Sequence, residues 1–122
     1  MLIIFLLLKM IITFADKKLK KYANNNSLAL QRMGAKRAKL YQKRLGDMAD
    51  AECFADLEHL PGRFHQLTEN RQDQWSCDLD HPYRLIFEPS EEPITKDEHG
   101  KQILIEIKSL KIIEVTDYHK KG

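Results

Sequence analysis

The feature that most constrains this chain is a change of hydrophobic period at Pro61-Gly62. Over most of the chain before this dipeptide, apolar side chains recur every three or four residues, which is typical of amphipathic helices. After it they tend to alternate with polar ones, which is typical of strands. Because helices and strands are segregated along the chain rather than interleaved, the sequence predicts an α+β fold.

The helical part opens with a short strand. Met10–Phe14 is apolar and partly β-branched, and Asp16 follows as a helix cap. A helix is expected over Lys17–Tyr22, then a turn, with Ser27 capping the next helical segment and Gly34 ending it.

The strongest helix in the chain is expected at Ala35–Ala51. Ala38, Tyr41, Leu45 and Met48 return at helical spacing and predict a face that packs on the core. The basic side chains of this helix are expected on its other faces.

The second half of the chain predicts a meander of short strands. Three of them share alternating patterns separated by plausible hairpin connections: Arg63–Leu67, Gln74–Leu79 and Tyr83–Glu88. Pro89–Gly100 is polar and rich in breakers, so it predicts an exposed loop, and the apolar runs Ile103–Ile105 and Leu110–Val115 predict one or two final strands. Together these elements predict two to three helices packed on an antiparallel sheet of about four strands.

The first nine residues are the least consistent with this domain. Leu2–Leu8 is uninterrupted and apolar, but a signal sequence would place a positive charge before such a run, and a membrane span needs about twenty apolar residues. Met10 begins a complete strand pattern by itself. We therefore expect a single domain over residues 10–119, with residues 1–9 as an upstream extension from an earlier start codon. A membrane-anchored or exported protein is the alternative.

Charge along the chain is segregated although the net charge is only +2. Between Lys17 and Arg44 there are ten cations and no carboxylate. Such a stretch favours contact with phosphates, against the plainer interpretation of a solvated helix face. Four of the cations in the strongest helix are the candidate ligands for nucleic-acid phosphates: Lys36, Lys39, Lys43 and Arg44.

Two cysteines, Cys53 and Cys77, lie in different segments without metal-ligand spacing. This pattern supports neither a disulfide scaffold nor a zinc site, and it fits a reducing, cytoplasmic compartment. We expect no cofactor or metal, with Cys53 buried and Cys77 within a strand.

Three short clusters contain side chains suited to proton transfer and phosphate binding: His65 with Arg71, Arg84 within an apolar strand, and Asp117-Tyr118-His119. Cutting RNA without a metal requires a base for the 2′-hydroxyl, an acid for the leaving 5′-oxygen and cations for the transition state. Each cluster taken alone is more often structural, since a single strand histidine or arginine is usually hydrogen-bonded or exposed.

The order of these clusters resembles the HigB branch of the RelE/ParE toxin superfamily. The likeness rests on four runs in register, Leu57–Leu67, Asn70-Arg71 with Gln74-Trp75, Tyr83–Pro89 and Asp117–His119, and it extends over about residues 10–119. It implies a RelE-like fold and a cytoplasmic endoribonuclease that cleaves messenger RNA on the ribosome. It also implies neutralisation by a helix-turn-helix antitoxin of the HigA type, with operator DNA bound only through that antitoxin.

Carried over by position, the resemblance implies a catalytic set of five residues: His65, Arg84, Asp117, Tyr118 and His119. Arg71 and Arg84 would bind phosphate, Tyr118 would stack or position a base, and the acid-base pair would come from His65, Asp117 and His119 in an order that stays open.

One position departs from the family pattern. Thr68 stands where the family commonly has a lysine, and losing one cation at the transition state costs on the order of a hundredfold in rate. Either Arg71 substitutes for that lysine or the activity is weak. The competing hypothesis is therefore a non-catalytic relative that binds an antitoxin, an operator complex or gyrase.

Overall fold

A computed structural model describes residues 9–117, apart from the side chain of Glu69. In chain order its strands and α-helices are β1 (Ile11–Phe14), α2 (Lys17–Asn24), α3 (Asn26–Met33), α4 (Ala35–Asp50), β2 (His65–Gln66), β3 (Trp75–Asp78), β4 (Tyr83–Pro89) and β5 (Ser109–Asp117). Three short 3-10 helices complete the set: η1 (Phe54–His59), η2 (Glu69–Arg71) and η3 (Leu104–Glu106).

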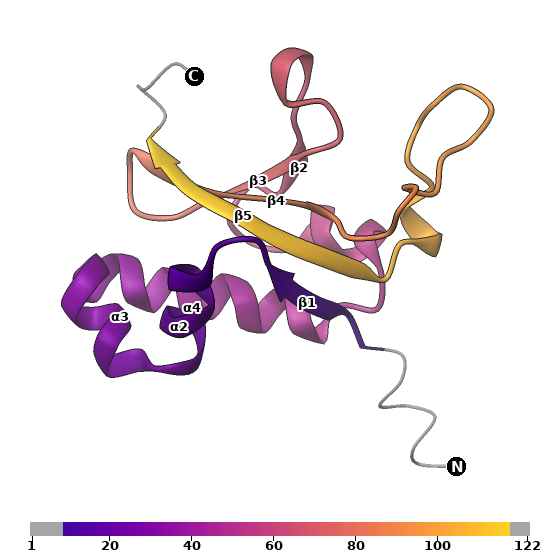
Figure 1. The fold of residues 1–122 in the computed structure, drawn as a ribbon. Coiled ribbons are helices and arrows are strands. Elements are labelled where there is room, and N and C mark those ends of the chain that lie inside the picture. Colours follow the sequence, from indigo (N-terminus) through magenta and orange to yellow (C-terminus); the bar gives the residue numbers. More distant parts are fainter. Residues whose placement is uncertain (1–8, 118–122) are drawn as a thin grey trace, which may run out of the picture.

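The strands form one sheet in the order β1-β5-β4-β3-β2. Strands β2 to β5 are antiparallel to their neighbours, and β1 joins the edge of β5 in parallel. The three α-helices lie together on one side of this sheet (Figure 1). The predicted α+β class with an N-terminal strand is thus confirmed, with β1 as a fifth strand of a mixed sheet.

The core lies between the helices and the sheet. Tyr41 and Met48 of α4 are fully buried, and so are Trp75 and Phe87 of the sheet. The ring of Phe54 in η1 meets the edge of Trp75 at a centroid distance of 5.4 Å. The predicted core face of α4 is therefore confirmed, because Ala38 and Leu45 are buried as well.

Three local predictions are wrong. The cap of α3 is Asn25, whose side-chain oxygen accepts a hydrogen bond from the Leu28 amide at 3.1 Å, not Ser27. The apolar run at Ile103–Ile105 contributes to η3 and not to a strand, and Ile105 is 69% exposed. Cys53 is only half-buried, whereas Cys77 is buried within β3 as predicted.

The expectation that Arg44 lies on an outer face of α4 is also wrong. Its side chain is buried, and its Nε donates to the carbonyl of Asp78 at 2.7 Å. Gly62 makes this possible, because a Cβ built at that residue would lie 2.6 Å from the Cζ and Nε of Arg44. The Asp78 amide in turn donates to the Gly62 carbonyl at 2.7 Å. Arg44 thus binds α4 to the end of β3 and packs against the turn before β2.

We expect Gly62→Ala to destabilise the fold by more than about 1 kcal/mol, because Gly62 has φ +111° and no room for a methyl group. Gly46→Ala is the matched control. Gly46 lies in α4 with open space around it, so the exchange is expected to stabilise by about 0.5–1 kcal/mol. Urea unfolding of both variants measures the difference, and equal effects would contradict this account of Gly62.

Candidate functional site

The sheet has a second side, away from the helices, that is mostly polar. Cross-strand partners point to the same side of a sheet, and the pairing aligns His65, Ser76, Ile86 and Glu114 in one row over four strands. The next row contains Asp78, Arg84 and Thr116. We call this side of the sheet, with Glu88 and Lys111 included, the polar face.

A register shift in β5 creates part of this face. Ile112 pairs with Phe87 on the core side, whereas Glu114 pairs with Ile86, so one extra residue lies between them. Without the bulge, Glu114 would share the buried side with Ile112, because residues two apart in a strand point the same way. The bulge therefore keeps a carboxylate on the polar face.

Arg71 reaches this face from η2. Its Nη1 lies 2.8 Å from Oε2 of Glu114 and donates to Oε1 of Gln74 at 3.0 Å. Gln74 donates in turn to Glu88 at 3.2 Å, and Lys111 lies 3.8 Å from that carboxylate. The predicted phosphate ligand Arg71 is thus paired with a carboxylate, whose negative charge opposes the binding of a phosphate.

His65 lies on the polar face of the edge strand β2. Its Nδ1 is 2.7 Å from the carbonyl oxygen of Arg63. The guanidinium of Arg63 pairs with Asp78 at 3.2 Å. His65 is half-buried on this edge strand.

Arg84 lies two strands away from His65 on the same face. Its cross-strand neighbours are Asp78 on β3 and Thr116 on β5. Between His65 and β4 lies Ser76, which is fully buried and whose hydroxyl has no hydrogen-bond partner within the described part of the chain. Since adjacent strands lie about 4.8 Å apart, the backbones carrying His65 and Arg84 are separated by about 10 Å or somewhat more.

The third predicted cluster is described only in part. Asp117 ends β5 opposite Tyr83, a register position on the helix-covered side, whereas its neighbour Thr116 pairs with Arg84. Tyr118 and His119 lie outside the described residues. The structure therefore brings His65, Arg84 and Arg71 to one face, and it places Asp117 at the end of a strand with the opposite orientation.

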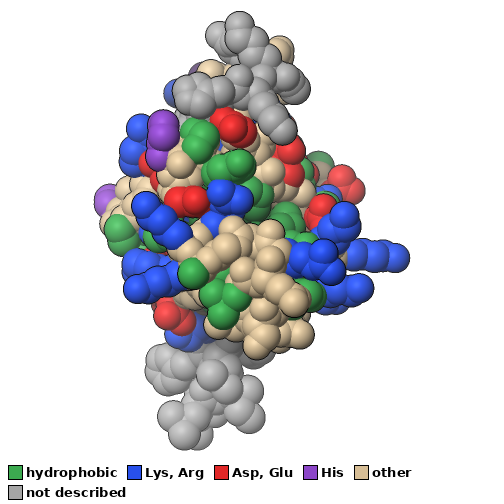
Figure 2. All heavy atoms as spheres, turned by 90° about the vertical axis from the view of Figure 1, so that its left-hand side faces the viewer, with side chains coloured by type: hydrophobic (Ala, Val, Ile, Leu, Met, Phe, Trp, Pro, Cys, Tyr) green, Lys and Arg blue, Asp and Glu red, His purple; other side chains and the backbone are tan. Residues whose placement is uncertain are grey.

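The basic helices form a separate surface. Lys36 and Lys39 are exposed on α4, and no ion pair to another described residue involves them, whereas Lys43 pairs with Asp47 at 3.2 Å. Figure 2, a view onto the end of the molecule on the left of Figure 1, shows lysine and arginine side chains on both flanks of a largely neutral middle. Of the four predicted RNA ligands of α4, three are exposed and Arg44 is buried.

A further ionic cluster joins α4 to β4 and was missed by the sequence analysis. Arg37 donates to both carboxylate oxygens of Asp80, at 2.8 and 3.1 Å, and its Cζ lies 3.5 Å from the centre of the Tyr83 ring. Burial opposes ionisation of Asp80, but the hydrogen bonds and charge of Arg37 outweigh it and lower the pKa of this carboxyl. Sequence spacing gives no signal for such a pair, because its members are 43 residues apart.

This cluster gives a pH-dependent prediction. The pKa of Asp80 in the folded protein lies below its unfolded value of about 4. The contribution of the ionised carboxylate to the free energy of unfolding is therefore complete above about pH 4, and it is lost as the pH falls through the folded-state pKa. At neutral pH we expect Asp80→Asn to cost about 1–3 kcal/mol. Urea midpoints of the two proteins should converge as the pH is lowered below about 4, and a constant difference would contradict this assignment.

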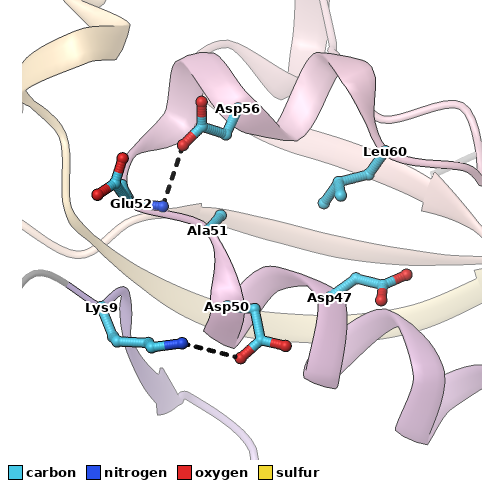
Figure 3. A pocket seen from close by; sticks show the side chains of 7 residues that line it. All are labelled: Lys9, Asp47, Asp50, Ala51, Glu52, Asp56 and Leu60. Carbon is cyan, nitrogen blue, oxygen red and sulfur yellow. Dashed lines mark hydrogen bonds and ion pairs between the residues drawn. The ribbon is translucent and has the colours of Figure 1, made fainter. Parts of the chain in front are cut away.

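A hollow lies elsewhere, between the end of α4 and η1. Its volume is about 590 Å³, and four carboxylates line it, from Asp47, Asp50, Glu52 and Asp56 (Figure 3). Lys9 pairs with Asp50 at 3.4 Å, and Asp56 accepts from the Glu52 amide at 3.1 Å. A hollow with this charge repels phosphates, so it is not part of the candidate site.

Within residues 9–117, no group of three or more histidine, cysteine, aspartate or glutamate side chains is arranged to hold a metal ion. The same range contains no helix with the length and apolar character to cross a membrane.

Comparison with models of known protein families and with curated proteins gives no match to this sequence.

Proposed function

We propose that this protein is a toxin of a type II toxin–antitoxin system, a ribosome-dependent endoribonuclease that cleaves messenger RNA by metal-free acid-base chemistry. The observation that supports it most is the shared polar face of His65 and Arg84, a proton-transfer group and a cation that are both half-buried on one side of the sheet. The exposed lysines of α4 add a surface on which structured RNA can be held.

The proposed reaction needs no cofactor. A base takes the proton of a 2′-hydroxyl, and the 2′-oxygen attacks the adjacent phosphorus. The bond from phosphorus to the 5′-oxygen breaks, and an acid protonates that oxygen. The products are a 2′,3′-cyclic phosphate and a 5′-hydroxyl. Arg84 and Arg71 would stabilise the charge on the phosphorane. His65 would transfer one of the two protons and His119 the other, because Asp117 has a register position on the helix-covered side.

The expected partners follow from the same proposal. A helix-turn-helix antitoxin would neutralise the toxin, operator DNA would be bound only through that antitoxin, and the ribosome would present the messenger RNA. These partners place the protein in the cytoplasm.

A second function is favoured by the ion pair between Arg71 and Glu114. This guanidinium is bound to Glu114, and Thr68 stands beside it where a lysine would supply charge. A site with so few available cations suits a non-catalytic member that acts by binding an antitoxin, an operator complex or gyrase.

Induced expression followed by mapping of messenger RNA 5′ ends separates the two functions. The nuclease predicts new ends within minutes, phased with the reading frame, because the ribosome presents the substrate. The binding function predicts no new 5′ ends, whether or not growth is inhibited. Expression together with the product of the adjacent gene should remove the new ends and yield a co-purifying complex.

A further inference from the structure

His65 is held by its own chain in a way that selects one of its two neutral forms. The Nδ1 atom lies 2.7 Å from the Arg63 carbonyl oxygen. A carbonyl oxygen only accepts hydrogen bonds, so Nδ1 must carry the proton. In the neutral ring, Nε2 is then unprotonated and has a free lone pair.

We propose that the backbone carbonyl of Arg63 is a positioning group that fixes this tautomer, and that Nε2 of His65 is the general base toward the 2′-hydroxyl. The second part rests on the proposed nuclease function. It assigns one of the two roles that the sequence leaves open, because the acid must then come from a group other than His65.

The conformation of Arg63 supports a dedicated role for its carbonyl. Its φ is +52°, in the left-handed region that few non-glycine residues adopt. Such backbone persists only where the surroundings hold it, and it clusters at functional sites. Here it directs the carbonyl back toward the side chain two residues later.

The surroundings of Arg63 fix that conformation from both sides. Asp78 binds the segment twice, with its amide on the Gly62 carbonyl at 2.7 Å and its carboxylate on Nε of Arg63 at 3.2 Å. Gly62 packs against the buried side chain of Arg44, which also donates to the carbonyl of Asp78. The carbonyl that orients His65 is therefore anchored to β3 and α4.

The tautomer is measurable by itself. In ¹⁵N-labelled protein at alkaline pH, where imidazoles are uncharged, the nitrogen shifts and couplings of the His65 ring show which atom carries the proton. We expect the proton on Nδ1 of His65, and on Nε2 of the exposed His99, because free histidine favours the Nε2 form. A proton on Nε2 of His65 in the wild-type protein would overturn the proposal without any variant.

Two substitutions separate the backbone from the guanidinium. Arg63→Gly and Arg63→Val both remove the pair with Asp78, but glycine keeps the left-handed conformation and valine strongly disfavours it. We expect the glycine variant to keep the Nδ1 proton. The valine variant should shift toward the Nε2 form and cleave at least about tenfold more slowly than the glycine variant.

The outcomes are distinguishable from failure of the nuclease proposal. An Nδ1 proton in the wild-type protein and in Arg63→Gly, with its loss in Arg63→Val, supports the positioning role even if no protein cleaves RNA. An unchanged tautomer in a folded Arg63→Val protein overturns it. If both variants cleave RNA and do so at equal rates, the assignment of Nε2 as the base is overturned.

Discussion

His65→Ala is expected to slow messenger RNA cleavage by about 10²- to 10⁴-fold, the range that a positioned general acid or base contributes. The side chain is half-buried at the edge of the sheet, and its ring nitrogen is hydrogen-bonded to the nearby Arg63 carbonyl, so the fold should survive. Antitoxin binding should persist, since the variant removes a proton-transfer group and no charge from the basic helices.

His99→Ala is the matched control for this prediction. His99 lies in the loop between β4 and β5, is largely exposed and is 3.8 Å from Glu98. Its replacement should leave the cleavage rate within about twofold of the wild-type rate, because it is exposed and lies outside the strands that form the polar face. A rate for His65→Ala that matches that of His99→Ala would remove His65 from the mechanism.

Phe87→Ala is expected to lower the free energy of unfolding by about 3–5 kcal/mol. Phe87 is fully buried on β4, and its ring lies 6.0–6.3 Å from those of Phe54, Phe64 and Trp75. Removing it leaves a cavity where η1, the segment before β2 and the sheet meet. The loss is a large part of the stability that a domain of this size has.

Fluorescence of Trp75, the single tryptophan, follows unfolding in urea directly. Ile105→Ala provides the control, because Ile105 is 69% exposed and should change the unfolding free energy by less than about 0.5 kcal/mol. If the two variants had similar stability, the core would not be organised around Phe87.

Much of the fold follows from periodicity. The apolar positions of α4 recur at helical spacing and all face the core, and the alternation in β3 and β4 places Trp75 and Phe87 on the buried side. The helical part ends at Pro61-Gly62. At Gly62 the chain passes close to the Arg44 side chain, and the Gly62 carbonyl accepts a hydrogen bond from the Asp78 amide. The periodic patterns depend on residues that are near one another in the chain, so a single sequence is enough to predict them.

Other features depend on distant residues and could not be predicted. Arg44 has the pattern of an exposed helix cation, and only the absence of a side chain at Gly62 lets it reach the Asp78 carbonyl. The bulge that turns Glu114 outward breaks the alternation on which strand predictions rest. The parallel pairing of β1 with β5 joins residues about a hundred positions apart.

The candidate site was predicted in part. His65 and Arg84 share a face because of the register in which β2, β3 and β4 pair. Alternation within each strand predicts two faces, but it does not give the register between strands. The hydrogen bond from His65 to Arg63 and the ion pair of Arg71 with Glu114 depend on backbone and side-chain geometry that spacing does not encode. For Asp117, the apolar pattern predicts a position at the end of the last strand. It does not predict the orientation opposite Tyr83.

Cleavage by the purified protein on translating ribosomes tests the central claim most directly. A defined messenger RNA, stalled with a known codon in the ribosome, is incubated with the protein, and the ends of any fragments are identified chemically. The account predicts one cut at the presented codon, with a 2′,3′-cyclic phosphate upstream and a 5′-hydroxyl downstream. Intact messenger RNA after incubation with folded protein, freed of its antitoxin, would contradict it.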